Sequence, residues 1–298
     1  MIAVTISFFY SSVLARRETR TIEPIAKSIH LWTTDQPWPS LDSFDVTCEV
    51  KITLIDWASV LEIDGLELPN DCHIYKPSTR ATTNMLFIGD SISSGFSLED
   101  ATSPALPLGI LDAYPYQTAN SLSNNGMDVE VEVVAYPGIT LCGGMSDKFF
   151  CRSVWDATPF KPSLSVIDFK YVFIALGTND VVSASEFSKT LLKFIKELLT
   201  TPQMKETETV YILHPFIDFT EPLDSLNIEN LPLHISYESK PRKDIRIVTV
   251  PQSRICQDLN YEHTLDGLHP TVDGHKLIGG NLAKFVFEDL RVPDNLNS

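Results

Sequence analysis

Three residues of this sequence have side chains that together could perform nucleophilic catalysis: Ser91, His269 and Asp266. A serine hydroxyl is unreactive until a neighbouring base removes its proton, and an imidazole oriented by a carboxylate is suited to that task. Because Asp266 lies three residues before His269, one loop can carry both groups. We therefore predict that Ser91 is a nucleophile, His269 its general base and Asp266 the acid that orients the imidazole.

Each of these residues also has a simpler interpretation when it is taken alone. Ser91 follows Asp90, and both residue types are common at helix starts, so Gly-Asp-Ser by itself favours Ser91 as the N-cap of a helix. The Asp-Gly pair before His269 is typical of a turn with an exposed histidine. The catalytic interpretation depends on a whole set of short motifs, called islands here, whose order is difficult to obtain by chance. The four islands are Gly89-Asp90-Ser91, Gly138, Gly177-Thr178-Asn179-Asp180 and Asp266-Gly267-Leu268-His269-Pro270.

Two further islands supply hydrogen-bond donors for negative charge that develops on a substrate. Asn179 follows one apolar run, and Gly138 follows another. We predict an oxyanion hole formed by the backbone N–H of Ser91, the backbone N–H of Gly138 and the side-chain amide of Asn179. Taken singly, Asn179 is more typical of a loop residue bonded to its own turn. The dipeptide Pro137-Gly138 is typical of a turn, which does not exclude the donor role.

The islands follow short apolar runs of the kind found in strands that are buried on both faces of a sheet. Helical periodicity occurs between some of these runs, after a capping box at Ser183 and Glu186, and again from Thr271 onward. This alternation predicts an α/β fold with a mainly parallel five-stranded sheet and helices on both faces, in which ligands bind at the carboxyl edge. The expected strands are residues 85–88, 129–134, 171–176, 210–213 and 245–250.

Residues 1–80 are predicted to form a separate β module, and residues 81–298 the domain that carries the islands. Residues 46–54 alternate in part between apolar and polar side chains, residues 59–65 resemble a second strand, and the polar segment 76–83 is typical of a linker. Residues 2–15 end in Val-Leu-Ala, which resembles a signal-peptide cleavage site. A β-strand is preferred there, because no basic region precedes the segment and hydroxyl residues interrupt it.

Composition limits the classes of partner. The 298 residues include 23 basic and 39 acidic side chains, a net charge of −16, which opposes binding to nucleic acid or to an anionic membrane. The sequence contains no run of about 18 consecutive apolar residues, so no membrane-spanning helix is predicted. The acidity and the leader-like N-terminus favour export, and we expect a monomer.

The five cysteines show no spacing typical of zinc ligands, so no metal site is expected. Cys142 and Cys151 either form a disulfide or remain separate thiols, with no preference between the two. Among the other histidines, His214 is more typical of packing than of a cleft wall. His275, on the last expected helix, is predicted to lie at the surface.

Together the islands resemble the sequence blocks of SGNH, or GDSL-type, hydrolases. Ser91 matches the first block, Gly138 the second, Asn179 the third, and Asp266 with His269 the fifth. The first block reads Gly-Asp-Ser-Ile here instead of Gly-Asp-Ser-Leu. The resemblance covers about residues 84–290 and implies a flavodoxin-like three-layer fold, with the oxyanion hole formed as described above.

A β module before such a domain, with residues 54–62 leading into it, is similar to family-2 carbohydrate esterases. Those proteins pair a jelly-roll domain with an SGNH domain and remove acetyl groups from sugars. The resemblance implies a small β-sandwich, a partial jelly roll, in residues 1–80. It also implies a carboxylic-ester hydrolase that acts on acylated carbohydrate through an acyl-serine, without a cofactor. The alternatives are a lipase, lysophospholipase or thioesterase on the same scaffold, and a non-catalytic carbohydrate-binding protein.

Overall fold

The computed structural model describes residues 2–10, 13–22, 48–55, 83–97, 106–159, 168–220 and 245–291. The chain divides into two compact units, Met1–Arg80 and Ala81–Ser298. The strand expected at 59–65 and the linker expected at 76–83, apart from its last residue, lie outside the described residues.

The described residues of the first unit form one antiparallel sheet in the order β2-β1-β3. Its strands are β1 (Ile2–Tyr10), β2 (Val13–Ile22) and β3 (Cys48–Leu54). The central strand β1 buries Ile6, which pairs with Glu18 on one side and with Ile52 on the other. The segment that resembles a leader thus contributes a strand, as preferred. The rest of the expected β-sandwich falls on residues outside the described part.

The second unit contains a five-stranded sheet in the order β5-β4-β6-β7-β8, and every neighbouring pair is parallel. The predicted parallel sheet is confirmed. In chain order the strands lie 2-1-3-4-5, which is the flavodoxin-like arrangement. Their bounds are β4 (Thr83–Gly89), β5 (Val129–Ala135), β6 (Tyr171–Ala175), β7 (Thr209–Leu213) and β8 (Arg246–Val250).

The central strands of this sheet are buried on both faces, which explains their nearly continuous apolar sequences. In β4, Met85 and Phe87 join one hydrophobic cluster, whereas Leu86 and Ile88 join the cluster on the opposite face. On the first face the ring of Phe87 stacks on that of Phe173 in β6, with 4.3 Å between ring centroids. Side chains on both sides therefore fix the register of the sheet and the position of its carboxyl edge.

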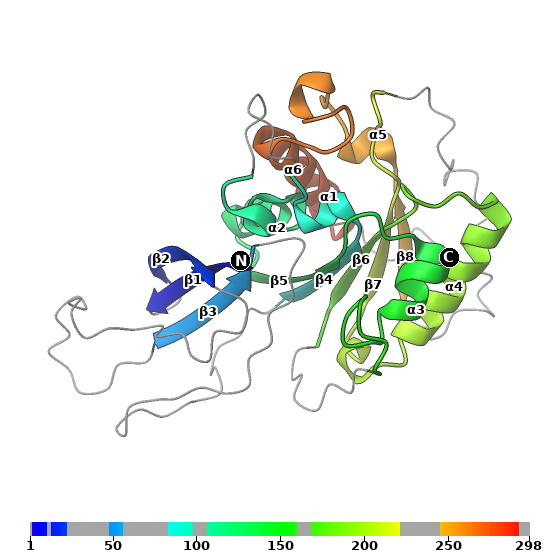
Figure 1. Cartoon of the computed structure of the whole chain (residues 1–298), viewed down its shortest axis with the longest axis horizontal. Coiled ribbons are helices and arrows are strands. Elements are labelled where there is room, and N and C mark those ends of the chain that lie inside the picture. Colours follow the sequence, from blue (N-terminus) through cyan, green and yellow to red (C-terminus); the bar gives the residue numbers. More distant parts are fainter. Residues whose placement is uncertain are drawn as a thin grey trace, which may run out of the picture. The chain divides into compact units, whose positions relative to one another are not determined.

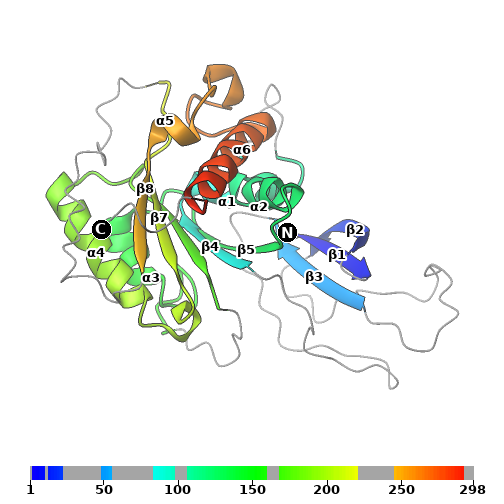
Figure 2. The same cartoon turned by 180° about the vertical axis from the view of Figure 1, so that it is seen from behind.

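Two layers of helices cover the sheet (Figures 1 and 2). Helices α2 (Tyr114–Asn124) and α6 (Val272–Asp289) contribute to the first hydrophobic cluster, and α4 (Ala184–Leu198) contributes to the second. The short helices are α1 (Ser91–Ser94), α3 (Ser146–Lys148) and α5 (Gln252–Ile255), with helical turns η1 (Gly109–Asp112), η2 (Leu141–Met145), η3 (Pro202–Met204) and η6 (Tyr261–His263). In the part of the chain that is described, no helix has the length and apolar character needed to span a membrane.

The predicted cap of α4 is confirmed, because Ser183 Oγ accepts a hydrogen bond from Glu186 N–H at 3.2 Å. Helix α2 was not expected from the sequence, and no side chain of its own N-cap residue caps it. Instead, His275 Nδ1 in α6 accepts the hydrogen bond of Tyr114 N–H at 3.2 Å. A residue distant in sequence thus satisfies one of the free donors at the start of α2.

The ends of three adjacent strands lie side by side at the carboxyl edge. Gly89 at the end of β4 pairs with Ala135 of β5 and with Ala175 of β6. Three loops therefore leave the sheet next to one another, at the point where chain connections diverge to opposite sides. Open α/β sheets bind ligands at such points.

Candidate active site

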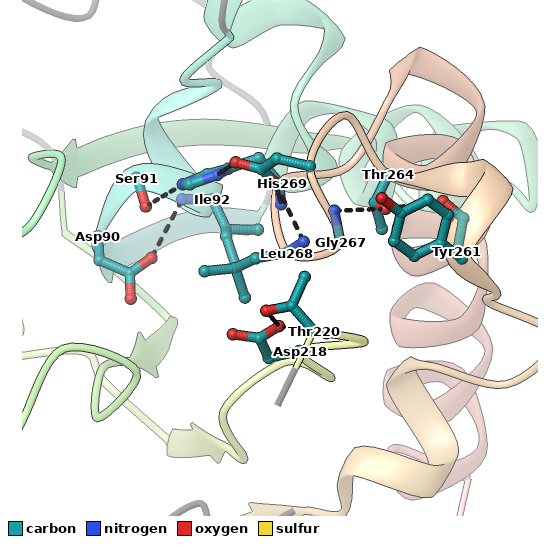
Figure 3. A network of polar contacts seen from close by, with 11 residues as sticks. Asp90, Ser91, Ile92, Asp218, Thr220, Tyr261, Thr264, Gly267, Leu268 and His269 are labelled. Atoms are coloured by element: carbon teal, nitrogen blue, oxygen red, sulfur yellow. Dashed lines mark hydrogen bonds and ion pairs between the residues drawn. The ribbon is translucent and has the colours of Figure 1, made fainter. Parts of the chain in front are cut away.

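Ser91 is the first residue of α1 and follows β4 after one intervening residue, Asp90. Asp90 caps the helix, since its Oδ1 accepts a hydrogen bond from Ile92 N–H at 3.1 Å (Figure 3). Gly89 lets the helix approach the sheet, because a Cβ there would lie 2.0 Å from Ser93 Oγ and 3.2 Å from the Ala175 carbonyl oxygen. The cap of this helix is therefore Asp90, whereas the simpler interpretation expected Ser91, and the serine is the first helical residue, at the carboxyl edge.

The segment that carries Asp266 and His269 is a tight loop closed by an isolated bridge between Thr264 and Pro270. Gly267 adopts a φ of 97°, which a residue with a side chain rarely adopts. Asp266 Oδ1 accepts hydrogen bonds from Leu268 N–H at 3.0 Å and from His269 N–H at 2.8 Å. The second carboxylate oxygen is therefore left for the histidine ring.

Hydrogen bonds join the three predicted catalytic side chains. His269 Nδ1 lies 2.7 Å from Asp266 Oδ2, and His269 Nε2 lies 3.0 Å from Ser91 Oγ (Figure 3). A carboxylate is only an acceptor, so this arrangement assigns the proton of the neutral ring to Nδ1 and leaves Nε2 free to accept from the serine hydroxyl. Residues 178 positions apart in the chain thus meet as predicted, whereas their catalytic roles stay a prediction.

Burial and hydrogen bonding act in opposite directions on the two carboxyl groups near this serine. Burial alone would raise the pKa of Asp266, but hydrogen bonds from the His269 backbone, the His269 ring and Leu268 N–H outweigh it and hold that pKa below its usual value. Asp90 is 1% exposed, and burial raises its pKa to about 6 despite the bond from Ile92 N–H. Asp266 contacts the His269 ring directly and holds its charge more strongly than Asp90, so it is the carboxylate placed to stabilise an imidazolium.

Two of the three predicted oxyanion donors, Gly138 and Asn179, lie on the loops that follow β5 and β6. Gly138 has a φ of 73°, and, apart from its chain neighbours, no atom of the described residues lies within 4 Å of where a Cβ would stand. Asn179 Nδ2 donates to the Ile139 carbonyl oxygen at 3.1 Å, which joins the two loops. Among the described residues, none accepts a hydrogen bond from Ser91 N–H or Gly138 N–H. Both donors are free to bind a ligand, and the oxyanion hole stays a prediction.

Three residues of this region had no assigned role in the sequence interpretation. Asp180, next to Asn179, accepts backbone hydrogen bonds from the loop after β5. Asp90 caps α1, and the Phe96 ring lies against that of His269 with 4.6 Å between centroids. Both aspartates stand inside the islands, so their position was a signal. The place of Phe96 depends on packing and has no signal in its local sequence.

The structure corrects the expectation for His275. It was predicted at the surface, but it is 0% exposed, and burial lowers its pKa to about 3. The prediction was wrong because this face of α6 packs against α2, a helix that the sequence did not reveal. His214 is buried, 5% exposed, in keeping with a packing role.

The cysteine alternatives are resolved for one pair. Cys142 and Cys151 carry free thiols, so the structure has no disulfide between them. Within the described ranges, no group of three or more His, Cys, Asp or Glu side chains is placed to hold a metal ion.

Several solved structures share this fold. A carbohydrate esterase family 2 enzyme with a carbohydrate-binding domain from Corynascus thermopiles (Myceliophthora fergusii) is 16% identical, with a TM-score of 0.58 over 97% of this chain and 88% of that one. A family-two carbohydrate esterase from Cellvibrio japonicus is 12% identical, with a TM-score of 0.62 over 96% and 82% of the two chains. One from Clostridium thermocellum, in complex with cellohexaose, is 14% identical, with a TM-score of 0.54 over 97% and 88%.

At the level of sequence, no family model and no curated protein matches the chain. The likeness to solved structures shows the fold. The predicted α/β three-layer fold is confirmed, and so is the structural similarity to family-two carbohydrate esterases.

Proposed function

We propose that this protein is a serine esterase that removes small acyl groups, acetyl above all, from carbohydrate. The observation that carries the proposal is the run of hydrogen bonds from Asp266 through His269 to Ser91. It ends on a hydroxyl at the carboxyl edge of a parallel sheet, next to backbone donors with no partner of their own in the described structure.

In the first half of the reaction, Ser91 Oγ attacks the ester carbonyl carbon while His269 Nε2 takes its proton. The carbonyl electron pair moves onto oxygen, where Ser91 N–H, Gly138 N–H and the Asn179 amide donate hydrogen bonds to it. The intermediate collapses, the bond from the carbonyl carbon to the sugar oxygen breaks, and that oxygen takes the proton from His269. Asp266 stabilises the imidazolium throughout.

In the second half, a water molecule attacks the acyl-serine and gives a proton to His269. A second tetrahedral intermediate collapses, Ser91 Oγ leaves and recovers its proton, and the acid is released. Water is the only co-reactant that these steps consume.

Two observations support carbohydrate as the substrate class. Solved structures that share the fold over nearly the whole chain are carbohydrate esterases, and one of them holds cellohexaose. The net charge of −16 also suits a neutral substrate better than an anionic one, because an acidic protein repels anions.

The test is acetate release from acetylated polysaccharides by the wild-type chain and by Ser91→Ala. Removing the nucleophile of such a site typically costs a factor of about 10⁶ in kcat, so we expect release to fall to background. Ser146→Ala is the matched control, since within the described part of the chain the hydroxyl of this serine bonds only its neighbour Asp147. A fluorophosphonate probe should label the wild type and this control but not Ser91→Ala.

Three other outcomes would redirect the assignment. Retained activity in Ser91→Ala would remove the proposed mechanism. A preference for long acyl chains in a series of p-nitrophenyl esters would favour a lipase or thioesterase. Binding of carbohydrate without hydrolysis and without probe labelling would indicate a non-catalytic protein.

A further inference from the structure

We propose that Asp180 is a positioning residue of the oxyanion hole, because its carboxylate fixes the loop that presents Gly138 N–H. The inference rests on the proposed function, since it concerns donors of the same site. Asp180 belongs to the third island of the sequence, but neither the relay to Ser91 nor the predicted donors include its side chain.

Both carboxylate oxygens of Asp180 are engaged with the backbone of the loop after β5. Oδ2 accepts from Leu141 N–H at 2.8 Å, and Oδ1 accepts from Cys142 N–H at 2.9 Å. The two donors begin the helical turn η2, where N–H groups have no partner within the turn. Asp180 is only 9% exposed, so water competes weakly for these bonds. Hydrogen bonds to an ionised acceptor are about twice as strong as those between neutral groups.

A third bond joins the same two segments, from Asn179 Nδ2 to the Ile139 carbonyl oxygen. On the other side of Gly138, Tyr136 N–H donates to the carbonyl oxygen of Gly89 at 3.3 Å. Gly138 therefore lies between two anchors. One connects the loop to the strand end before Ser91, and the other connects it to the residues after β6.

The positions of these anchors explain how Asp180 acts on a donor that it does not touch. Strand β6 lies between β4 and β7, so the residues that follow it start from the interior of the sheet. Strand β5 is an edge strand, and in this sheet it pairs with β4 alone. A backbone donor stabilises an oxyanion only when it is held in place before the charge develops. Through its two hydrogen bonds, Asp180 holds the loop after the edge strand β5 to the residues that follow the interior strand β6.

The sign of the charge separates this role from a direct electrostatic one. A negative side chain near a developing oxyanion opposes it, so its direct effect is to slow the reaction. Removing the charge should then raise kcat if Asp180 acts through its field, and lower kcat if Asp180 acts through position. The variant Asp180→Asn makes this distinction, because the amide keeps the shape and one acceptor while its NH₂ group faces a backbone donor.

The experiment uses the full chain with Asp180→Asn and, as matched control, Asp147→Asn, an exposed carboxylate on the nearby helix α3. Complete loss of one oxyanion donor costs about 10²–10³ in kcat, so partial misplacement should cost about 10- to 100-fold on p-nitrophenyl acetate. KM should stay within about twofold, because the donors act on the transition state. The inhibition constant of a trifluoromethyl ketone, which forms an oxyanion with the serine, should rise by the same factor as kcat falls. The control should match the wild type in all three quantities.

An unchanged or raised kcat in Asp180→Asn, or a change in KM alone, would overturn the inference. If this variant does not fold, amide hydrogen exchange of the wild type decides: the N–H groups of Leu141 and Cys142 must be protected, and fast exchange there refutes the clamp. Failure of the proposed function has a different signature. In that case the wild type itself shows no ester hydrolysis, or its hydrolysis survives Ser91→Ala.

Discussion

The imidazole of His275 should make the folded protein sensitive to acid. The side chain is 0% exposed, and its Nδ1 accepts a hydrogen bond from Tyr114 N–H at 3.2 Å. This nitrogen must therefore be unprotonated in the folded state. Burial is the main cause that lowers the pKa of His275 from 6.5 to about 3.

The sign and size of the effect follow from proton linkage. Between pH 6.5 and about 3 the unfolded chain binds a proton at His275 and the folded chain does not, so stability is lost as the pH falls through this window. One pKa unit corresponds to about 1.4 kcal/mol, so the free energy of unfolding falls by about 5 kcal/mol over the whole window. At pH 4.5, two units below the unfolded value, the loss of unfolding free energy is about 3 kcal/mol.

The variant His275→Asn removes the titration and retains a side-chain oxygen able to accept from Tyr114 N–H. We expect denaturant unfolding to show that the wild type loses about 3 kcal/mol more than the variant between pH 7.5 and pH 4.5. All other ionisable groups are common to both proteins and cancel in the comparison. Equal losses in the wild type and His275→Asn would refute the reasoning.

Three further substitutions have defined outcomes. Because burial raises the pKa of Asp90 from 3.8 to about 6, the folded state holds that proton more tightly and stability falls as pH rises through this window, by about 3 kcal/mol. Between pH 4 and pH 8, the unfolding free energy of Asp90→Asn should therefore rise relative to that of the wild type. Denaturant titrations that show the same change with pH in both proteins would contradict this. Asp266→Asn should lower kcat by up to about 10⁴ with little change in KM, because the ring of His269 loses its orienting acceptor; a near-normal kcat in steady-state assays would dismiss that role. Gly89→Ala should cost about 1–3 kcal/mol, because its Cβ would lie 2.0 Å from Ser93 Oγ, and an unchanged melting temperature would show that α1 shifts freely.

The features that the sequence predicted are those set by short stretches of chain. The five parallel strands were placed within a few residues. For the central strands β4, β6 and β7, a short apolar run is itself the consequence of burial on two faces. The cap at Ser183 depends on a residue three positions later, and the turn at Asp266 depends on His269, also three positions later. In each case the interacting groups are joined by a few rotatable bonds, so residue type and spacing suffice.

Packing between distant segments decided the rest. Helix α2 was missed and His275 was placed at the surface for one common reason. His275 accepts the hydrogen bond of the first N–H of α2, and the two segments are 161 positions apart in the chain. The role of Asp180 was also hidden, because its partners lie 38 and 39 positions away on another loop. By itself the sequence determined which groups are available for chemistry and which local turns hold them. Only the tertiary structure decided which of them meet, because the distance between groups on separate loops depends on how the whole sheet and its two helical layers pack.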